Sequence, residues 1–398
     1  MENTGKKVTA TSLIMGVAFV WFTTHFGGGF ASGAQLYSYF VRYGVFSIIM
    51  PVLAMGYNAL FFTYCLRYAR RHEVYDYRSY NNSFYGRFAP VFSNLFEFLY
   101  IVVMCVAPAV AFATGGATLH AVTGLPYLLC TLIIGAFIFV VAIFGTSLVR
   151  RVSFILSIVI IAGMIGVYVP NILANTDAIS NTMATMQSAH MSFGSALYSA
   201  FIYGTFQLCN VAVFVQHAQA FEQPGDAKKS MLAGFVINAA IMVMGVIGLM
   251  TVCNDPNLAN ESVPTLMMVQ KGVGASVLTP LISVLIILGA VTTAVNMVAA
   301  MVKRIGDAVE TEEERKATDA GRPILKTVLI ALGCCLVDFG IAQFGLLTLI
   351  AKAYSFIAYL AIPVILIPYI IHMVATRFDT KPIVRDAKEA PERAANSR

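Results

Sequence analysis

Ten long apolar segments, separated by shorter polar gaps, constrain this chain more than any other feature of its sequence. Each segment is long enough to cross a bilayer core, which needs about 20 helical residues. Backbone polar groups find no water in lipid, so segments of this kind must be helical. The segments cover residues 9–41, 44–67, 90–119, 126–147, 152–174, 193–220, 229–252, 275–302, 323–340 and 344–375. The sequence therefore predicts an all-α membrane protein with ten transmembrane helices.

The composition also indicates lipid as the solvent. Hydrophobic residues make up 58% of the 398 residues and charged residues 12%, whereas soluble domains carry about 25% charged residues. The seven cysteines show no metal-ligand spacing. No Ser/His, zinc-motif or paired-carboxylate constellation lies within the apolar segments. We therefore do not expect an enzyme.

Basic residues are divided very unevenly between the two sides that ten spans define. Of the 26 Lys and Arg residues, 23 fall on one side, Arg42 and Lys271 fall on the other, and Lys352 lies within the last span. The positive-inside rule then predicts a multi-pass protein of the inner (cytoplasmic) membrane with both termini cytoplasmic. The basic residues form juxtamembrane clusters suited to lipid headgroups and no compact basic domain, so lipid, not nucleic acid, is the expected partner.

The ten spans divide into five plus five. Glycine-interrupted segments 1 and 6, and the unusually long segments 3 and 8, recur after similar numbers of residues. A unit of five helices has odd parity, so its second copy would enter the membrane inverted, as in many transporters. We expect a first repeat in residues 1–175, an inverted second repeat in residues 190–376, and a disordered cytoplasmic tail in residues 377–398.

Three polar stretches interrupt the bundle. Residues 68–89 are predicted to form a cytoplasmic loop with several aromatic side chains, and residues 303–322 a charged, partly helical cytoplasmic stretch. The outer loop of residues 253–274 becomes apolar after Pro264. That pattern predicts a short helix lying over the outer face, a candidate lid.

The middle of the first segment contains a run of three glycines, Gly27 to Gly29, followed by Gly33. Each glycine weakens a helix by about 1 kcal/mol relative to alanine, so the run predicts a break. Freed backbone groups in a membrane need protein, water or a ligand as partners. The N–H groups of Gly29, Phe30 and Ala31 would then suit an anionic group such as a carboxylate. The alternative is close helix packing through small residues.

Segment 6 carries Gly204 among polar side chains, which predicts a second, weaker break at that glycine. Tyr203, Thr205 and Gln207 supply hydroxyl and amide groups, and we interpret them as site residues. Asn210 fits a site or a hydrogen bond between helices equally well.

Segment 8 contains two adjacent hydroxyls, Thr292 and Thr293. Paired hydroxyls beside an unwound helix are hard neutral oxygens of the kind that coordinates sodium. Threonines in membrane helices also bond to their own preceding turn, so both interpretations stay open. In segment 3, Tyr100 and Met104 fit a pocket wall or ordinary packing.

Three ionisable side chains lie within or near the spans. Lys352 in segment 10 and Asp338 in segment 9 are each expected roughly 10 Å below the outer surface, counting about 1.5 Å per residue. They fit a structural ion pair or, alternatively, a lysine that replaces a coupling cation. Glu97, near the cytoplasmic end of segment 3, is expected to pair with an arginine.

The string GGGFASGAQ, at residues 27–35, resembles the GxGFASGQE signature of the YkvI-like membrane protein family. That family belongs to the amino acid–polyamine–organocation superfamily, which has the LeuT fold. The resemblance implies ten helices in a 5+5 inverted repeat with discontinuous helices 1 and 6. This sequence has Ala34 and Gln35 where the family has Gln and Glu. A coupling role for that carboxylate therefore does not carry over.

The resemblance also implies a solute site near the membrane midplane, between helices 1 and 6 and walled by helices 3 and 8. The implied substrate-binding residues are Gly27, Gly28, Gly29, Phe30, Tyr100, Met104, Tyr203, Thr205, Phe206 and Gln207. It further implies a sodium site made by the backbone carbonyls of His25 and Gly28 and the hydroxyls of Thr292 and Thr293. No cofactor is implied beyond Na⁺ as coupling ion.

The sequence thus predicts a secondary active transporter, with Na⁺-coupled symport of an amino acid or similar small polar organic solute by alternating access. Two alternatives stay open. One is a proton-coupled transporter that uses Lys352 and Asp338. The other is a transporter-like receptor or sensor that binds the solute without moving it.

Overall fold

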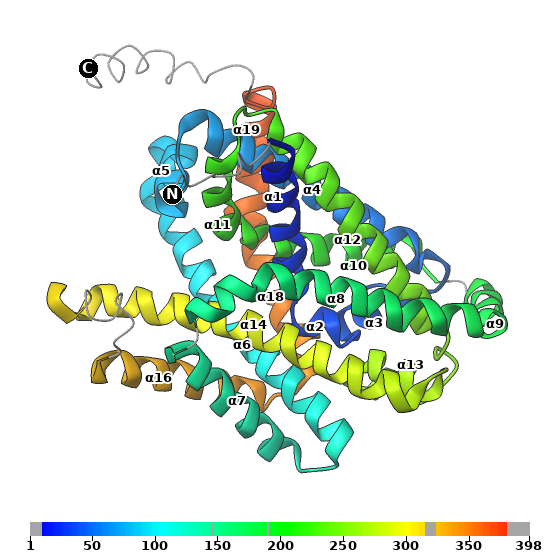
Figure 1. Cartoon of the computed structure of the whole chain (residues 1–398). Coiled ribbons are helices and arrows are strands. Elements are labelled where there is room, and N and C mark those ends of the chain that lie inside the picture. The colour runs from blue at the N-terminus through cyan, green and yellow to red at the C-terminus, as the bar shows by residue number, and fades with distance from the viewer. Residues whose placement is uncertain (1–9, 145, 189–190, 315–323, 380–398) are drawn as a thin grey trace, which may run out of the picture.

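A computed structural model of the chain describes residues 10–144, 146–188, 191–314 and 324–379, and every element in these ranges is helical (Figure 1). Eight of its helices are long and apolar enough to cross a membrane. A ninth span results if Ile158–Ala174 and Thr176–Ser188, which meet at a bend of 78°, count as one. The predicted class, a multi-pass helical membrane protein, is confirmed. The number of ten spans and the inverted repeat stay predictions.

The first half of the chain contains most of the short and interrupted helices. Its elements are α1 (Ala10–His25), α2 (Gly28–Ala31), α3 (Ala34–Tyr39), the 3₁₀ segment η1 (Val41–Ser47), α4 (Ile49–His72), α5 (Tyr77–Tyr85), η2 (Gly86–Phe88), α6 (Ala89–Thr123), α7 (Tyr127–Phe144), α8 (Thr146–Ala174) and α9 (Thr176–Ser188).

The second half begins with a helical stretch that alternates between α-helix and 3₁₀ helix, and it ends with a stretch that alternates between α-helix and π-helix. Its elements are α10 (Phe193–Gln207), η3 (Leu208–Asn210), α11 (Val211–Phe214), η4 (Val215–Ala220), α12 (Asp226–Met250), η5 (Leu258–Asn260), α13 (Pro264–Lys271), α14 (Ala275–Val309), α16 (Leu325–Ala342), α17 (Leu346–Thr348), η6 (Leu349–Ala353), α18 (Tyr354–Ala361), η7 (Ile362–Leu366) and α19 (Ile367–Ala375).

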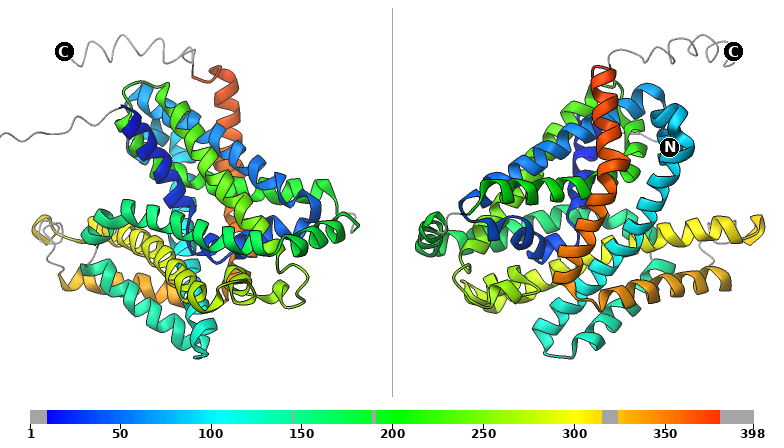
Figure 2. Two further views of the ribbon diagram at one scale, coloured as in Figure 1. Left: turned by 45° about the vertical axis from the view of Figure 1, so that its right-hand side comes forward. Right: turned by 180° about the vertical axis from the view of Figure 1, so that it is seen from behind.

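The long helices pack in two groups. The first comprises α1, α4, α10 and α12, and the second comprises α6, α7, α14 and α16. Helices α8, α14 and α16 run across the direction of α1 and α19 (Figures 1 and 2). The short helices α2 and α3 connect the groups, because α2 packs on α6 and α14 while α3 packs on α10 and α12.

The break in the first segment is confirmed and has two glycine hinges. Gly27 is extended (φ −89°, ψ 178°), which ends α1 and restarts the chain as α2. Gly33 then turns the chain into α3 with a φ of 81°, a left-handed conformation that glycine adopts without steric cost. The predicted single apolar segment is therefore three helices.

The predicted break at Gly204 is wrong in position. Helix α10 stays regular through Gly204 to Gln207 and only then tightens into the 3₁₀ turn η3. Gly204 serves close packing instead, because a Cβ on it would lie 2.5 Å from Cδ1 of Tyr57. Asn58 of α4 also donates a hydrogen bond of 2.7 Å to the Gly204 carbonyl.

The predicted loop of residues 68–89 is also wrong, because most of it is helical. Helix α4 continues to His72, and α5 begins after Asp76, whose Oδ1 accepts the Ser79 N–H at 2.8 Å. This N-cap satisfies a donor that the first turn would otherwise leave free. Tyr80 and Phe84 on α5 are buried and hold the helix against α4.

The predictions for the outer loop, the charged stretch and the C-terminal tail have different outcomes. The short helix after Pro264 is confirmed as α13, whereas α9 was not predicted. Helix α14 extends to Val309, so the start of the charged stretch 303–322 is helical as expected. Residues 315–323 and 380–398, which include most of the predicted tail, lie outside the described residues. The last segment contains two π-helical stretches, η6 and η7, and η7 includes Pro363, which has no N–H to donate.

Candidate functional site

A cavity of about 900 Å³ lies between the two groups of helices. Its wall includes the end of α1, parts of α5, α6 and α14, and the α11–η4 stretch. Four predicted site residues line it: Tyr100 and Met104 from α6, and Thr292 and Thr293 from α14. The structure therefore brings the predicted pocket wall and the predicted hydroxyl pair to one cavity.

Both threonines of the hydroxyl pair line the cavity, and both hydroxyls are bonded to the preceding turn of their own helix. Thr292 Oγ1 donates to the Leu288 carbonyl at 2.8 Å, and Thr293 Oγ1 donates to the Gly289 carbonyl at 3.0 Å. These bonds use the hydroxyl hydrogens but leave oxygen lone pairs. The break in the first segment is adjacent, because a Cβ on Gly27 would lie 3.7 Å from Thr293 Oγ1.

The carbonyls beside the break are only partly free. Those predicted to bind sodium already accept hydrogen bonds: His25 from the Gly27 N–H at 2.8 Å, and Gly28 from the Ser32 N–H at 3.0 Å. Within the described ranges, no donor reaches the carbonyl of Thr23 or Phe26, although both residues line the cavity. The carbonyls that accept no hydrogen bond thus belong to residues one or two positions away from the residues predicted to bind sodium.

Two of the three N–H groups predicted to bind an anion at the start of α2 already have partners within the chain. The N–H groups of Phe30 and Ala31 both donate to the Gly27 carbonyl, at 3.1 and 3.0 Å. Gly28 itself is wedged between helices, because a Cβ there would lie 2.9 Å from Thr114 Cβ and 3.2 Å from Ala290 Cβ. Close packing, the alternative interpretation of the glycine run, therefore explains Gly28.

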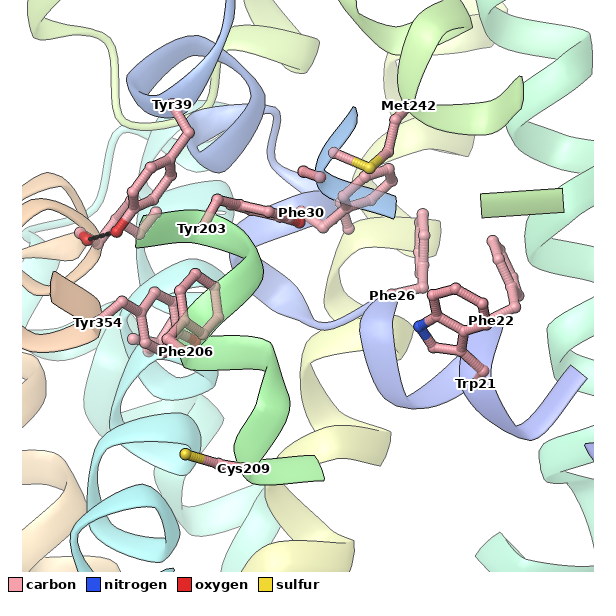
Figure 3. Packing of buried hydrophobic residues seen from close by; sticks show 14 of the residues in the cluster. Trp21, Phe22, Phe26, Phe30, Tyr39, Tyr203, Phe206, Cys209, Met242 and Tyr354 are labelled. Atoms are coloured by element: carbon pink, nitrogen blue, oxygen red, sulfur yellow. Dashed lines mark hydrogen bonds between the residues drawn. The ribbon is translucent and has the colours of Figure 1, made fainter. Parts of the chain in front are cut away.

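The remaining predicted substrate residues are buried in packing contacts away from the cavity wall. Phe206 stacks on Tyr354 with ring centroids 4.6 Å apart (Figure 3). Thr205 Oγ1 lies 3.2 Å from the Tyr57 hydroxyl, and Gln207 Oε1 accepts from Asn210 at 2.7 Å. Further such contacts involve Gly29, Phe30 and Tyr203.

A buried polar network that sequence analysis missed lies on the other side of the break. The His25 ring contacts Asn238 Oδ1 at 2.7 Å through Nδ1 and the Tyr203 hydroxyl at 2.5 Å through Nε2. Tyr203 also lies 3.4 Å from Gln35 Oε1. The available signal was a single amide, Asn238, within the apolar stretch of α12, together with a histidine at the glycine run.

The charged side chains that line the cavity are all basic: Arg78, Lys303 and Arg304. Arg304 forms an ion pair with Glu97, which confirms the pairing expected for that carboxylate. The Tyr77 hydroxyl donates to Glu97 Oε2 at 2.8 Å. This end of the cavity belongs to the side that the charge distribution predicts to be cytoplasmic.

Lys352 and Asp338 are not brought together. Lys352 is exposed on η6 and Asp338 is buried on α16, and no ion pair joins them in the part of the chain that the structure describes. The structure therefore does not show the predicted ion pair.

No protein-family model matches this sequence, and no curated protein is detectably similar to it. Among solved structures, the chain is similar to a mutant of the manganese transporter of Eremococcus coleocola, with 11% identity and a TM-score of 0.48 over 97% of this chain and 92% of the other. It is also similar to the E. coleocola transporter in complex with an aromatic bis-isothiourea substituted compound, with 13% identity and a TM-score of 0.45 over 97% and 91% of the two chains.

Proposed function

We propose that this chain is a secondary transporter that moves an amino acid or similar small polar organic solute by alternating access. The cavity carries the proposal: it lies between two groups of helices and ends at the break in the first segment. Freed backbone at membrane depth is tolerated where it lines a cavity or is buried in protein. A solute bound there would touch both groups, whose relative movement could expose it to either side.

Beyond the opposite end, α13 lies over the α2–α3 region. The Thr265 N–H donates to the Ser32 carbonyl at 2.9 Å, and Thr265 Oγ1 lies 2.7 Å from the Tyr168 hydroxyl. The first contact joins α13 to the α2–α3 region, and the second joins it to α8, which carries Tyr168. Together with the basic residues at the other end, they support a state that is open to the cytoplasm and closed to the outside.

The side chains of the cavity wall favour binding of an organic solute that carries a carboxylate. Its charged side chains are basic, and its polar side chains include Asn296 and Gln216. Manganese favours carboxylate, carbonyl and water ligands. Within the described residues, no three His, Cys, Asp or Glu side chains could hold a metal ion. An amino acid fits this chemistry better than a divalent metal.

The neutral oxygen atoms of the residues that line the cavity favour sodium as the coupling ion. Thr292 and Thr293, which carry hydroxyl oxygens, line the same cavity as Thr23 and Phe26, whose carbonyls accept no hydrogen bond within the described ranges. Neutral oxygens from two helices would tie α1 to α14 when the ion binds. Binding of solute and sodium would then strengthen each other by the same factor.

Uptake by proteoliposomes tests this function. Labelled amino acids are supplied under an inward Na⁺ gradient, a pH gradient or no gradient. We expect Na⁺-driven uptake that Thr292→Ala/Thr293→Ala abolishes and that Thr292→Ser/Thr293→Ser retains. Met104→Trp, which fills the cavity, should stop uptake, whereas Ile101→Trp on the exposed face of the same helix should not.

Two results would contradict the proposal. Sodium-independent uptake by the unmodified protein would contradict the proposed sodium site. Solute binding in a thermal-shift assay without uptake under any gradient would favour the receptor or sensor alternative, since a bound ligand stabilises the folded state whether or not it is moved.

A further inference from the structure

Large aromatic and apolar side chains from four helices line much of the cavity. They are Phe22 and Phe26 of α1, Tyr100 and Met104 of α6, Ile160 of α8 and Met297 of α14. The ring of Phe22 stacks on that of Phe26, with centroids 5.4 Å apart (Figure 3). The two residues on α1, like the two on α6, are four positions apart and therefore share one face of their helix. Successive turns of α1 and α6 thus present a continuous apolar wall to the cavity.

Water reaches this wall when no solute is bound. Asn296 and Lys303, which line the same cavity, are exposed. Apolar surface in contact with water is unfavourable, and a ligand that covers it gains binding free energy roughly in proportion to the covered area. A solute with an apolar portion therefore gains from this wall, whereas a wholly polar solute does not.

The cavity volume indicates how large that apolar portion is. A volume of about 900 Å³ lies in the upper part of the usual range for small-molecule pockets, roughly 300–1,000 Å³. An amino acid with a side chain of one or two carbons would leave most of the wall in contact with water. Met104 and Met297 have flexible, polarizable side chains that pack well against irregular apolar groups and ring edges. The wall thus suits a long aliphatic or an aromatic side chain.

The charges of the wall disfavour a cationic side chain on the solute. Among the described residues that line the cavity, the charged ones are Arg78, Lys303 and Arg304, and none is Asp or Glu. Glu97 already forms an ion pair with Arg304. A cationic side chain on the solute would lose water there without gaining a carboxylate partner, which is costly.

We propose that the solute is an amino acid with a large apolar side chain, which this wall selects over small, polar and cationic amino acids. Tyr100 and Met104 of α6 and Met297 of α14 are the specificity-determining residues, since they present apolar groups from two helices that line the cavity. The inference rests on the transport function proposed above, because it names the substrate of the same cavity. Binding, however, can be measured without transport.

A homologous series of ligands tests the wall in the purified full-length protein. The amino acids 2-aminobutyrate, norvaline and norleucine differ by one methylene each and share their amino and carboxylate groups. Isothermal titration calorimetry in the presence of Na⁺ should show binding that tightens about fourfold per methylene, because each methylene is buried against the wall. Lysine, whose side chain ends in an ammonium group, should bind at least about tenfold more weakly than norleucine.

Truncation of the wall is compared with truncation of the opposite face of the same helix. Met104→Ala should weaken norleucine binding by about fourfold or more relative to 2-aminobutyrate, because the longer side chain loses its contact. Ile101→Ala, on the exposed face of α6, should leave the series unchanged. Met297→Ala on α14 repeats the test if Met104→Ala folds poorly.

Three results would overturn the substrate class. They are a series that is flat or weakens with chain length, equal binding of lysine and norleucine, and an unchanged series in both Met104→Ala and Met297→Ala. Proteoliposome uptake separates these results from a failure of the transport function. Norleucine that binds as expected but is not taken up under any gradient would support the substrate class and contradict only transport. Na⁺-driven uptake that prefers serine to norleucine would contradict the class and leave transport standing.

Discussion

At the scale of single residues, the glycine run combines two functions that the sequence did not separate. Gly27 supplies an extended turn beside the cavity, and an added Cβ there meets only ordinary contacts. Gly28 lies where α2 approaches α6 and α14 most closely, and an added Cβ there would meet Thr114 and Ala290. An added methyl group should therefore disturb the packing at Gly28 much more than at Gly27.

Gly28→Ala should destabilise the protein by about 1–3 kcal/mol, the usual cost of inserting a methyl group into a packed interior. Gly27→Ala is the matched control and should cost much less, since its extended backbone is open to any residue and the nearest atom would be 3.7 Å away. Thermal unfolding in detergent measures both. Equal melting temperatures for the two variants would contradict the packing role of Gly28.

The site residues were predictable where residue type alone implies chemistry. The hydroxyl pair in segment 8 and the side chains Tyr100 and Met104 do line one cavity, as the sequence suggested. The side-chain role of His25 was not predictable, because its partners, Asn238 and Tyr203, are 213 and 178 positions away. Only packing of three helices brings these residues together.

At the scale of elements, α5, α6 and α14 are joined at the basic end of the cavity. Glu97 of α6 pairs with Arg304 of α14, and Tyr77 of α5 donates to the same carboxylate. The side chains of Arg304 and Glu97 are 29% and 16% exposed, so the pair is partly shielded from water. Shielded pairs interact more strongly than exposed ones.

A double-mutant cycle with Glu97→Gln and Arg304→Gln should give a coupling free energy of at least about 0.5 kcal/mol. The pair Asp226–Lys229 is the control, because its Lys229 side chain is 70% exposed while its Asp226 side chain is 10% exposed. Its cycle, Asp226→Asn with Lys229→Gln, should give about 0.3–0.5 kcal/mol, as for other helix-surface pairs. Additive single effects at Glu97 and Arg304 would show that the pair does not hold α6 to α14.

Element boundaries were predictable where hydropathy marks them and failed where side-chain packing decides. The apolar lengths of α4, α6, α7, α12 and α14 are close to the predicted spans. Helix α5 was missed because its polar sequence resembles a loop, while its aromatic residues are buried only after the chain folds back on α4. The break in segment 6 was misplaced because Gly204 accommodates Tyr57 instead of ending the helix.

At the scale of the whole molecule, the two ends of the cavity differ. One end carries Lys303 and Arg304 near the end of α14, and beyond the opposite end α13 lies over the α2–α3 region, just before α14 begins. Helix α1 starts and α19 ends on the same side of the molecule (Figures 1 and 2). That arrangement agrees with an even number of crossings, which hydropathy and charge predicted.

Cysteine accessibility tests this asymmetry in vesicles of both orientations. The native cysteines that are partly exposed, Cys105, Cys253 and Cys334, are first replaced by Ser. Asn296→Cys lies on the cavity wall and should react with a membrane-impermeant maleimide only from the cytoplasmic side. Asn260→Cys, exposed in the loop before α13, should react only from the outside.

Thr265→Cys reports the movement itself. Thr265 is a fully buried residue of α13 and should react from neither side in the state seen here. External Na⁺ and solute that favour an outward-open state should raise its reactivity from the outside and lower that of Asn296→Cys, because a ligand shifts the population toward the state that it binds better. If Asn296→Cys reacted from the outside, the orientation inferred from the basic residues would be reversed. If both positions reacted together without ligand, the cavity would be a continuous pathway, and alternating access would be wrong.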